Sequence, residues 1–307
     1  MQIRLFADPA TSPAAGTRNH SVVRELAIRA GRSRLSDEAS VDDISFETDA
    51  VVKRRKRDIM RSIVGILSVI ALPALFSSAM ADCNKLPDHA ALNSALKASV
   101  KAAGGPSNGG LDLNMWLTLV DRDGTVCQVT FSGSQYDDQW LGSRVISAQK
   151  ANTANAFSLK ALALSTANLY SAVQPGGSLF GLQESNPVNA QIAYAGKSRD
   201  FGTKSDPLVG KRIGGVNVFG GGLALYDNTG VIGAIGVSGD TSCADHNVAW
   251  RVRAALKLDK VPAGVSPNKN DGIIYDISNG MSKSGFGHPT CGGKEQDVAV
   301  ELHAGSK

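Results

Sequence analysis

Apolar residues recur every three to four positions over residues 88–103. Leu92, Leu96, Val100 and Ala103 fall on one face of a helix with this spacing. Asp88 precedes the first apolar position and suits an N-cap, because its carboxylate can accept hydrogen bonds from the free N–H groups of the first turn. Gly-Gly-Pro at 104–106 is typical of a helix end. The pattern therefore predicts a first helix here.

Short apolar runs separated by turn residues predict strands. Residues 115–120 and 125–131 are joined by Asp-Arg-Asp-Gly, in which the Asp-Gly pair favours the positive φ angles of a tight hairpin. Three later runs, at 216–219, 223–226 and 231–237, predict three more strands. Asp-Asn-Thr-Gly between the last two predicts a second hairpin turn.

Other periodic segments predict helices at 142–157, at 165–173, and from Thr241 or Ser242 to Leu258. The polar residues 184–212 are expected to form a long surface loop, and residues 260–307 are expected to be rich in loops. The order helix, two strands, helices, three strands, helix predicts the α+β class, with a five-stranded antiparallel sheet flanked by helices. Strands that come in hairpins argue against a parallel Rossmann sheet.

Residues 60–81 have the pattern of a secretory signal peptide. Met60-Arg61 precedes an apolar core at 62–76, and Ala-Met-Ala at 79–81 is an A-x-A cleavage site. A membrane anchor is the alternative, but the core is short for a span and contains Pro73. Residues 1–59 are then expected to be a disordered leader or the result of a misassigned start. The signal predicts a periplasmic or secreted protein with no stable membrane span after cleavage.

The basic excess of the chain lies in this N-terminal segment. The whole chain has a net charge of +4, whereas residues 82–307 carry 20 Lys+Arg and 19 Asp+Glu. The basic run at 53–57 can be a nucleic-acid patch or the flank of the apolar core, and we favour the flank. The nearly neutral remainder predicts no nucleic-acid partner.

All four cysteines follow the expected cleavage site, which favours two disulfides in an exported chain. Three pairings are open, and the sequence alone does not choose among them. We expect Cys83–Cys127 and Cys243–Cys291, because each would tie a terminal extension to the central domain. A structural zinc site is a weaker alternative, since no C-x-x-C pair is present.

Five segments in order, within residues 92–258, resemble the GlcG/HbpS-like haem-binding family, also called haem-degrading domains. The segments are L-T-L-V-D-R-D-G at 117–124, S-A-Q-K-A-N-T-A at 147–154, Q-P-G-G-S-L-F-G-L at 174–182, G-G-G-L at 220–223 and V-I-G-A-I-G-V-S-G at 231–239. The resemblance implies a profilin-like sheet, homo-oligomers, and binding of haem or a related tetrapyrrole. It places the family domain at 82–259 and leaves 260–307 as a C-terminal extension tied by a disulfide.

The chain departs from the family pattern in several places. Asn152 stands where a basic residue is usual, the loop from Gly181 to Gly221 is longer, and the turn at 241–246 differs. The tail containing His288-Pro-Thr-Cys is additional. These differences cluster where a ligand would bind and leave the exact ligand site open.

His246 is the first candidate iron ligand, because haem iron accepts a histidine nitrogen and Asp245 beside it can tune that ligand. The alternative is a surface or capping histidine. His288 would approach His246 if Cys243 pairs with Cys291, and two histidines held in this way can bind haem iron or a transition metal. The alternative for His288 is a loop residue beside a structural disulfide.

Four further candidates come from the resembling segments. Lys150 can pair with a haem propionate or another anion, and Thr153 can reach a ligand; the alternatives are an exposed lysine and a packed threonine. Gly176 and Gly177 can hold an anion with backbone N–H groups, or can simply set the shape of a turn. No G-x-S-x-G, phosphate loop or H-E-x-x-H pattern is present, so Ser238 is not expected to be a nucleophile.

The family resemblance and the export signal together imply an exported haem- or tetrapyrrole-binding protein that acts in uptake, sequestration or sensing. An enzyme that degrades haem or converts a small molecule is one alternative. An accessory subunit of an exported complex is the other, and the low content of aromatic residues favours it slightly.

Overall fold

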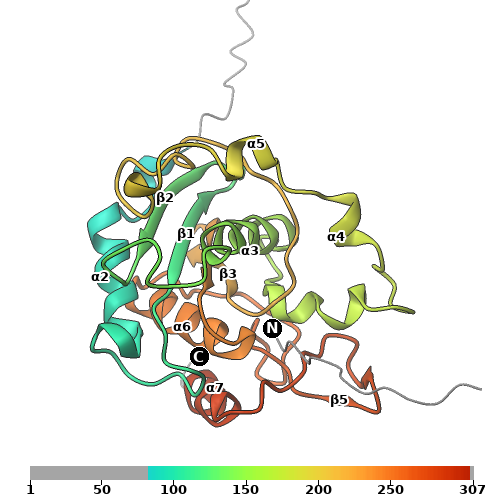
Figure 1. Cartoon of the computed structure of the whole chain (residues 1–307). Helices are drawn as coiled ribbons and strands as arrows, with labels where there is room; N and C mark the ends of the chain where they lie inside the picture. Colours follow the sequence, from blue (N-terminus) through green and yellow to red (C-terminus); the bar gives the residue numbers. More distant parts are fainter. Residues whose placement is uncertain (1–81, 305–307) are drawn as a thin grey trace, which may run out of the picture. The chain divides into compact units, whose positions relative to one another are not determined.

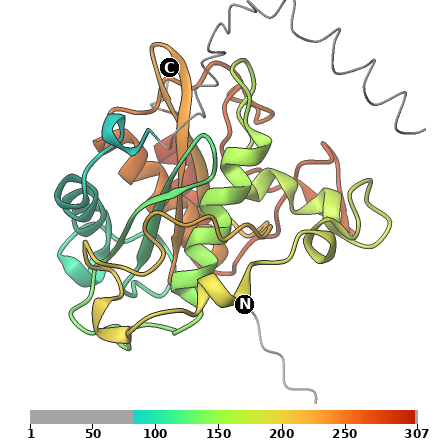
Figure 2. The same cartoon turned by 90° about the horizontal axis from the view of Figure 1, so that it is seen from above.

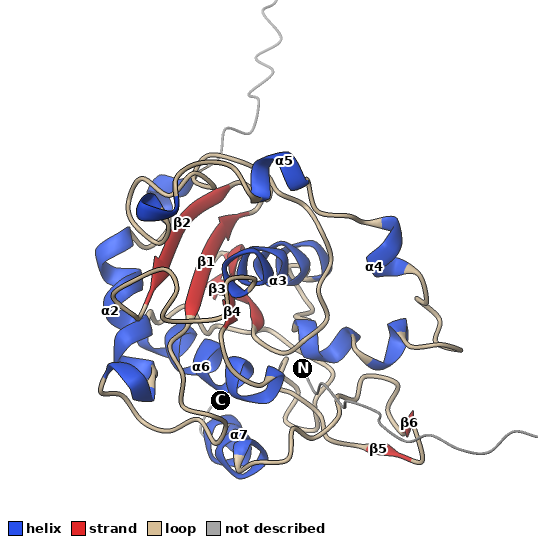
Figure 3. Cartoon of the chain, viewed as in Figure 1, coloured by secondary structure: helices blue, strands red, loops and turns tan. Residues whose placement is uncertain are grey.

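The computed structural model describes residues 82–304, which form a sheet with helices on both faces (Figures 1 and 3). The strands are β1 (Trp116–Asp121), β2 (Val126–Phe131), β3 (Gly222–Asp227), β4 (Gly230–Ser238), β5 (Ile277–Ser278) and β6 (Met281–Ser282). The α-helices are α2 (His89–Ser99), α3 (Ser143–Phe157), α4 (Leu182–Ser185), α5 (Ala190–Ala193), α6 (Ser242–Ala255) and α7 (Glu295–Ala304). The expected leader and signal peptide lie outside the described residues. Between Asp82 and Ala304 no helix has both the length and the apolar character needed to cross a bilayer.

The main sheet has the order β2-β1-β4-β3, and every neighbouring pair is antiparallel. Helix α3 packs against β1 and β4 on one face, and α2 and α6 cover the other (Figure 2). Successive side chains of β1 point to opposite faces of the sheet. Leu117 and Leu119 therefore lie in the core under α2 and α6, and Trp116 and Val120 lie in the core under α3. The central strand is therefore buried along its whole length, as the sequence predicts for residues 115–120.

The prediction of a fifth strand at 216–219 is wrong. Side chains, rather than a neighbouring strand, bind one backbone N–H group within this segment and one directly after it. Thr153 Oγ1 accepts from the N–H of Asn217 at 3.0 Å, and Ser242 Oγ accepts from the N–H of Gly220 at 2.7 Å. Because these hydroxyl groups satisfy the N–H groups, the segment can run along α3 and the start of α6 without joining the sheet.

The C-terminal extension is more ordered than the sequence predicts, since it contains the β5–β6 hairpin and α7. Acidic residues in the first turn favour α7, and Glu295 accepts a hydrogen bond from Thr241 Oγ1, the N-cap residue of α6. At the other end of α7, the His303 ring lies 4.1 Å from the Trp250 ring of α6. A buried Arg253–Asp271 ion pair also joins α6 to the extension.

Both expected disulfides are present, and the described residues contain no free cysteine. Cys83–Cys127 ties the start of the described chain to β2, and Cys243–Cys291 ties the first turn of α6 to the extension. The Cα–Cα distances of 5.4 and 6.1 Å lie within the range of ordinary disulfides.

Candidate functional site

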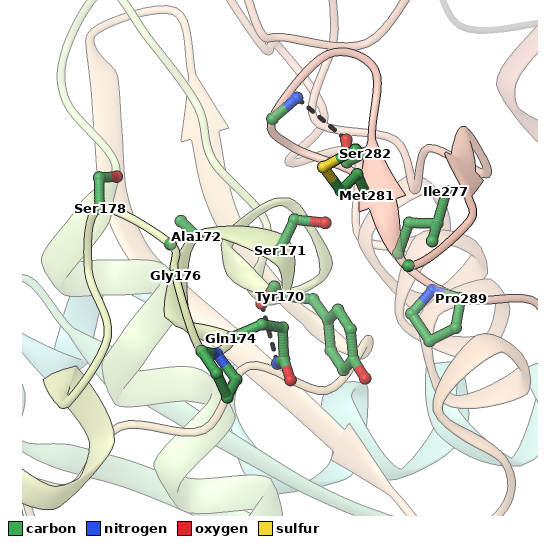
Figure 4. A pocket seen from close by; sticks show the side chains of 14 residues that line it. Tyr170, Ser171, Ala172, Gln174, Gly176, Ser178, Ile277, Met281, Ser282 and Pro289 are labelled. Carbon is green, nitrogen blue, oxygen red and sulfur yellow. Dashed lines mark hydrogen bonds between the residues drawn. The ribbon is translucent and has the colours of Figure 1, made fainter.

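A pocket of about 680 Å³ opens between the turn after residue 170 and the C-terminal extension (Figure 4). One wall comes from residues 170–178, with Tyr170 and Gln174, and the other comes from the hairpin that carries Ile277 and Met281. The residues that line it are Tyr170, Ser171, Ala172, Gln174, Pro175, Gly176, Gly177, Ser178, Ile277, Gly280, Met281, Ser282, Gly285 and Pro289. Its volume is in the range of ligand-binding pockets.

Hydrogen bonds hold the two walls at this separation. Ser171 Oγ donates to the carbonyl oxygen of Gly287 at 2.6 Å, which links the walls directly. In the extension, the Asp276 carboxylate accepts from Ser282 Oγ and from the N–H of Ser284, both at 2.7 Å. Partial burial opposes ionisation of Asp276, but these hydrogen bonds outweigh it and hold the Asp276 pKa below its ordinary value. The hairpin wall is thus braced by an ionised carboxylate.

Gly176 and Gly177 lie in the pocket wall, and each also has a reason to be glycine. Gly176 has φ +85°, a left-handed conformation that other residues adopt only with strain. A Cβ on Gly177 would lie 2.3 Å from the carbonyl oxygen of Ala172. The structure therefore shows that both glycines shape the turn and that both line the pocket; binding of an anion by their N–H groups stays a prediction.

His288 lies directly behind the pocket, with 2% of its surface exposed, and its ring is 5.0 Å from the ring of Tyr170. Nδ1 is 2.7 Å from the carbonyl oxygen of Pro289, which can only accept, so Nδ1 carries the proton. Nε2 then accepts from Ser242 Oγ at 2.7 Å. Burial lowers the pKa of His288 to about 4, so the imidazole is neutral at neutral pH.

Lys150 and Asp245 bind each other in the core. Lys150 Nζ is 2.7 Å from Asp245 Oδ2 and also donates to the carbonyl oxygen of Val237. Asp245 Oδ1 accepts from the N–H groups of Gly239 and Asp240. Both side chains are fully buried; burial raises the pKa of Asp245 to about 6, although attraction to Lys150 opposes the rise. The pair joins α3, the end of β4 and the start of α6.

His246 is fully buried on α6, against the rings of Trp250 and His303 at 6.0 and 5.7 Å. Neither ring nitrogen has a hydrogen-bond partner among the described residues. Burial holds the pKa of His246 well below its ordinary value, so the ring is neutral. An unpaired buried polar group of this kind destabilises a fold by about 1–3 kcal/mol.

The two histidines give a matched prediction. His288→Leu is expected to lower the free energy of unfolding by about 1–3 kcal/mol, because it leaves Ser242 and Pro289 without their partner. His246→Leu removes two unpaired nitrogens and is expected to be neutral or stabilising. Urea unfolding of both variants measures the difference, and equal losses would contradict this reading of His246.

The predicted site residues thus fall into two groups. Gly176 and Gly177 line the pocket, with His288 behind it. Lys150, Thr153, Asp245 and His246 lie in the core and line none of the described pockets; Thr153 Oγ1 is occupied by the carbonyl of Gln149 and the N–H of Asn217. Roles of these residues as ligands stay predictions.

Sequence reasoning missed the other pocket residues. The predicted helix at 165–173 is in fact two short 3-10 turns with Tyr170 between them, and Met281 lies in a tail without a motif. The one sequence feature that could have pointed to Tyr170 as a pocket residue is its position five residues before the Pro-Gly-Gly turn.

Comparisons with known proteins agree with the resemblance in the sequence. A family model described as haem degrading protein HbpS-like matches residues 91–254. An uncharacterized 15.0 kDa protein from the dhaT-dhaS intergenic region of Citrobacter freundii is 31% identical over 156 residues, which cover 50% of this chain and 85% of that protein.

Two solved structures are also similar. The Klebsiella pneumoniae protein ORFY is 25% identical, with a TM-score of 0.37 over 56% of this chain and 90% of that chain. The structure of a PduOC–haem complex is 26% identical, with a TM-score of 0.37 over 54% and 89%. The family match covers more than half of the sequence and includes the sheet, α3 and nearly all of α6. The chain therefore belongs to the HbpS-like family of haem-degrading proteins.

Proposed function

We propose that this protein binds haem, or a similar planar tetrapyrrole, in the pocket between Tyr170 and Met281. The observation that carries the proposal is the lining of that pocket, which combines a phenol and a thioether with a volume of about 680 Å³. Tyrosine and methionine are both known axial ligands of haem iron. Family membership supports the same ligand, since the family description names haem.

The other walls also suit a planar apolar ligand. Ala172, Ile277 and Pro289 contribute apolar surface, and Gly176 presents bare backbone on the opposite side from Met281. Haem, when bound, supplies a redox-active iron. The role of the chain is then to hold the macrocycle, to offer an oxygen or sulfur donor, and to keep the neutral His288 behind Tyr170.

We further propose that the protein works outside the cytoplasm, in haem uptake, sequestration or sensing. Two features support export. Residues 60–81 have a signal-peptide pattern, and all four cysteines are paired, as is usual in oxidising compartments. Assembly into a homo-oligomer remains a prediction from the family resemblance.

An absorbance titration of the full chain with haemin tests the proposal. We expect a saturable shift of the Soret band with about one haem per chain. Tyr170→Phe and Met281→Leu identify the iron donor, because loss of that donor is expected to move the band and weaken affinity at least tenfold. His246→Leu is the control and is expected to leave the titration unchanged, since His246 lies outside the pocket.

A titration in which His246→Leu abolishes the band, while both pocket variants behave as the wild type, would overturn the proposed site. Loss of the Soret band on addition of a reductant, with release of iron, would show that the bound haem is also degraded.

A further inference from the structure

Three donor atoms meet beside the pocket where α6 begins. The sulfurs of Cys243 and Cys291 and a ring nitrogen of His288 all lie within 4.8 Å of one another. Cys243 and His288 are buried, and Cys291 is half-buried. In the oxidised chain the sulfurs are joined, and Cys243 Sγ lies 4.0 Å from His288 Nδ1. Two thiolates and an imidazole are a set of ligands that zinc favours.

The surroundings would stabilise thiolates here once the disulfide opened. Cys243 is the second residue of α6, and its backbone N–H donates to Cys291 Sγ at 3.2 Å. The N-terminus of a helix carries partial positive charge, and thiols at this position ionise more readily than free cysteine. To present the Nδ1 lone pair to a metal, the neutral His288 ring must carry its proton on Nε2, where it can donate to Ser242 Oγ, and must give up the hydrogen bond from Nδ1 to the carbonyl oxygen of Pro289.

We propose that reduction of the Cys243–Cys291 disulfide creates a zinc site formed by Cys243, Cys291 and His288. An external dithiol supplies the two electrons. Its thiolate attacks one sulfur, the S–S bond breaks, and the other sulfur leaves as a thiolate. The second thiol of the reductant then releases the first cysteine and becomes part of the reductant's own disulfide. Zinc binds the two cysteine sulfurs as thiolates, with release of any thiol protons still present.

The geometry requires a small movement only. Zn–S bonds of about 2.3 Å and Zn–N bonds of about 2.0 Å at tetrahedral angles place two sulfurs about 3.8 Å apart, and a sulfur about 3.5 Å from the nitrogen. The Cys243–His288 distance of 4.0 Å is already close to the second value. The two sulfurs must separate, and residues 289–291 lie in a segment without helix or strand that can allow this. Three protein ligands leave the fourth position for water or substrate.

Two of the three ligands, His288 and Cys291, lie beyond the family's matched region, which ends at residue 254, whereas Cys243 lies within it. The site also differs from the second disulfide of the chain. Cys83 and Cys127 have Asp121 nearby, but that carboxylate already accepts from the backbone N–H groups of Asp82, Asp123 and Thr125. The Cys83–Cys127 pair is therefore an internal control for metal binding.

The test measures how readily each of the two disulfides is reduced in the full wild-type chain. The protein is equilibrated in thiol–disulfide buffers of set ratio, with and without free zinc at a fixed level, and its thiols are alkylated and identified by mass spectrometry. Zinc is expected to allow reduction of Cys243–Cys291 in a buffer at least tenfold more oxidising, because binding to the reduced form shifts the equilibrium. The Cys83–Cys127 pair is expected to be unaffected, and His288→Gln is expected to abolish the shift.

Cobalt provides a second readout in the reduced wild-type chain. A sulfur-to-cobalt charge-transfer band is expected after reduction and not before, and it is expected to be absent in the variant with both Cys243→Ala and Cys291→Ala. Circular dichroism verifies that each protein is folded. The absence of any zinc effect, an equal effect on both disulfides, or a shift that His288→Gln retains would overturn the proposal. Haem is absent throughout, so failure here leaves the haem proposal untouched.

Discussion

Lys150→Met is expected to lower the free energy of unfolding by about 3–5 kcal/mol, the range for breaking a buried ion pair by removing one partner. Lys150 and Asp245 are both fully buried, and Lys150 Nζ is the cation that faces the Asp245 carboxylate, at 2.7 Å. Without it, Asp245 keeps a charge that water cannot reach. Lys160→Met removes an exposed lysine and serves as the control, with no expected effect beyond about 0.5 kcal/mol.

The loss of stability caused by Lys150→Met is expected to depend on pH. Burial already raises the Asp245 pKa from 3.8 to about 6 in the folded wild type, and removal of the Lys150 charge raises it further. A carboxyl group with a raised folded-state pKa binds more protons in the folded state than in the unfolded chain, so stability falls as pH rises through that window. The Lys150→Met deficit is therefore expected to be small near pH 4 and to increase as pH rises above about 6, where the wild-type carboxyl group is already ionised and that of the variant is still partly protonated.

A second substitution separates charge from hydrogen bonding. Asp245→Asn keeps an oxygen that can accept from the N–H groups of Gly239 and Asp240 but carries no charge. Adding it to Lys150→Met is expected to restore more than half of the lost stability. Urea unfolding between pH 4 and pH 8 measures both effects. A deficit that is the same at every pH, with no recovery in the double variant, would contradict the ion-pair account.

Removal of the Cys243–Cys291 disulfide by two alanines is expected to cost about 2–4 kcal/mol, because the bond closes a loop with a sequence separation of 48. The Cys83–Cys127 bond, with a separation of 44, is the matched control and is expected to give a similar loss. Urea unfolding of the two double variants compares them directly.

The two variants should differ in ligand binding. Cys291 follows the pocket residue Pro289 by two positions, so loss of its bond to α6 frees one wall of the pocket. Haem affinity is therefore expected to fall at least fivefold in the Cys243→Ala, Cys291→Ala variant and to be unchanged in the Cys83→Ala, Cys127→Ala variant. Equal haem affinity in both would indicate that the extension does not form part of the site.

Local patterns predicted most of the framework. Asp88 caps the first helix as expected, and its carboxylate accepts from the N–H of Ala91. The two hairpins and α3 lie within one or two residues of their predicted bounds, because tight turns and helix ends depend on nearby residues, whereas α6 ends three residues before the predicted Leu258. The order of the expected elements was therefore sufficient to give the α+β class and an antiparallel sheet.

Long-range contacts account for what the sequence did not reveal. Residues 216–219 have the composition of a strand, but Thr153 binds the backbone of Asn217, and Ser242 binds that of the following residue, Gly220, from distant helices. Lys150 has its partner, Asp245, 95 residues away in the chain, and no local pattern could have predicted that pairing. Tyr170 and Met281 are 111 positions apart in the chain, and only the folded extension brings them to one pocket.

The most direct test of the central proposal fills the pocket and asks whether haem still binds. Ala172→Trp places an indole in the Tyr170–Met281 pocket, and Ala255→Trp places one in a separate surface hollow beside Arg251. Haemin titration of the full chain is expected to show at least a tenfold loss of affinity for Ala172→Trp and unchanged affinity for Ala255→Trp. Wild-type affinity in a folded Ala172→Trp variant, or no saturable Soret shift in the wild type, would contradict haem binding in this pocket.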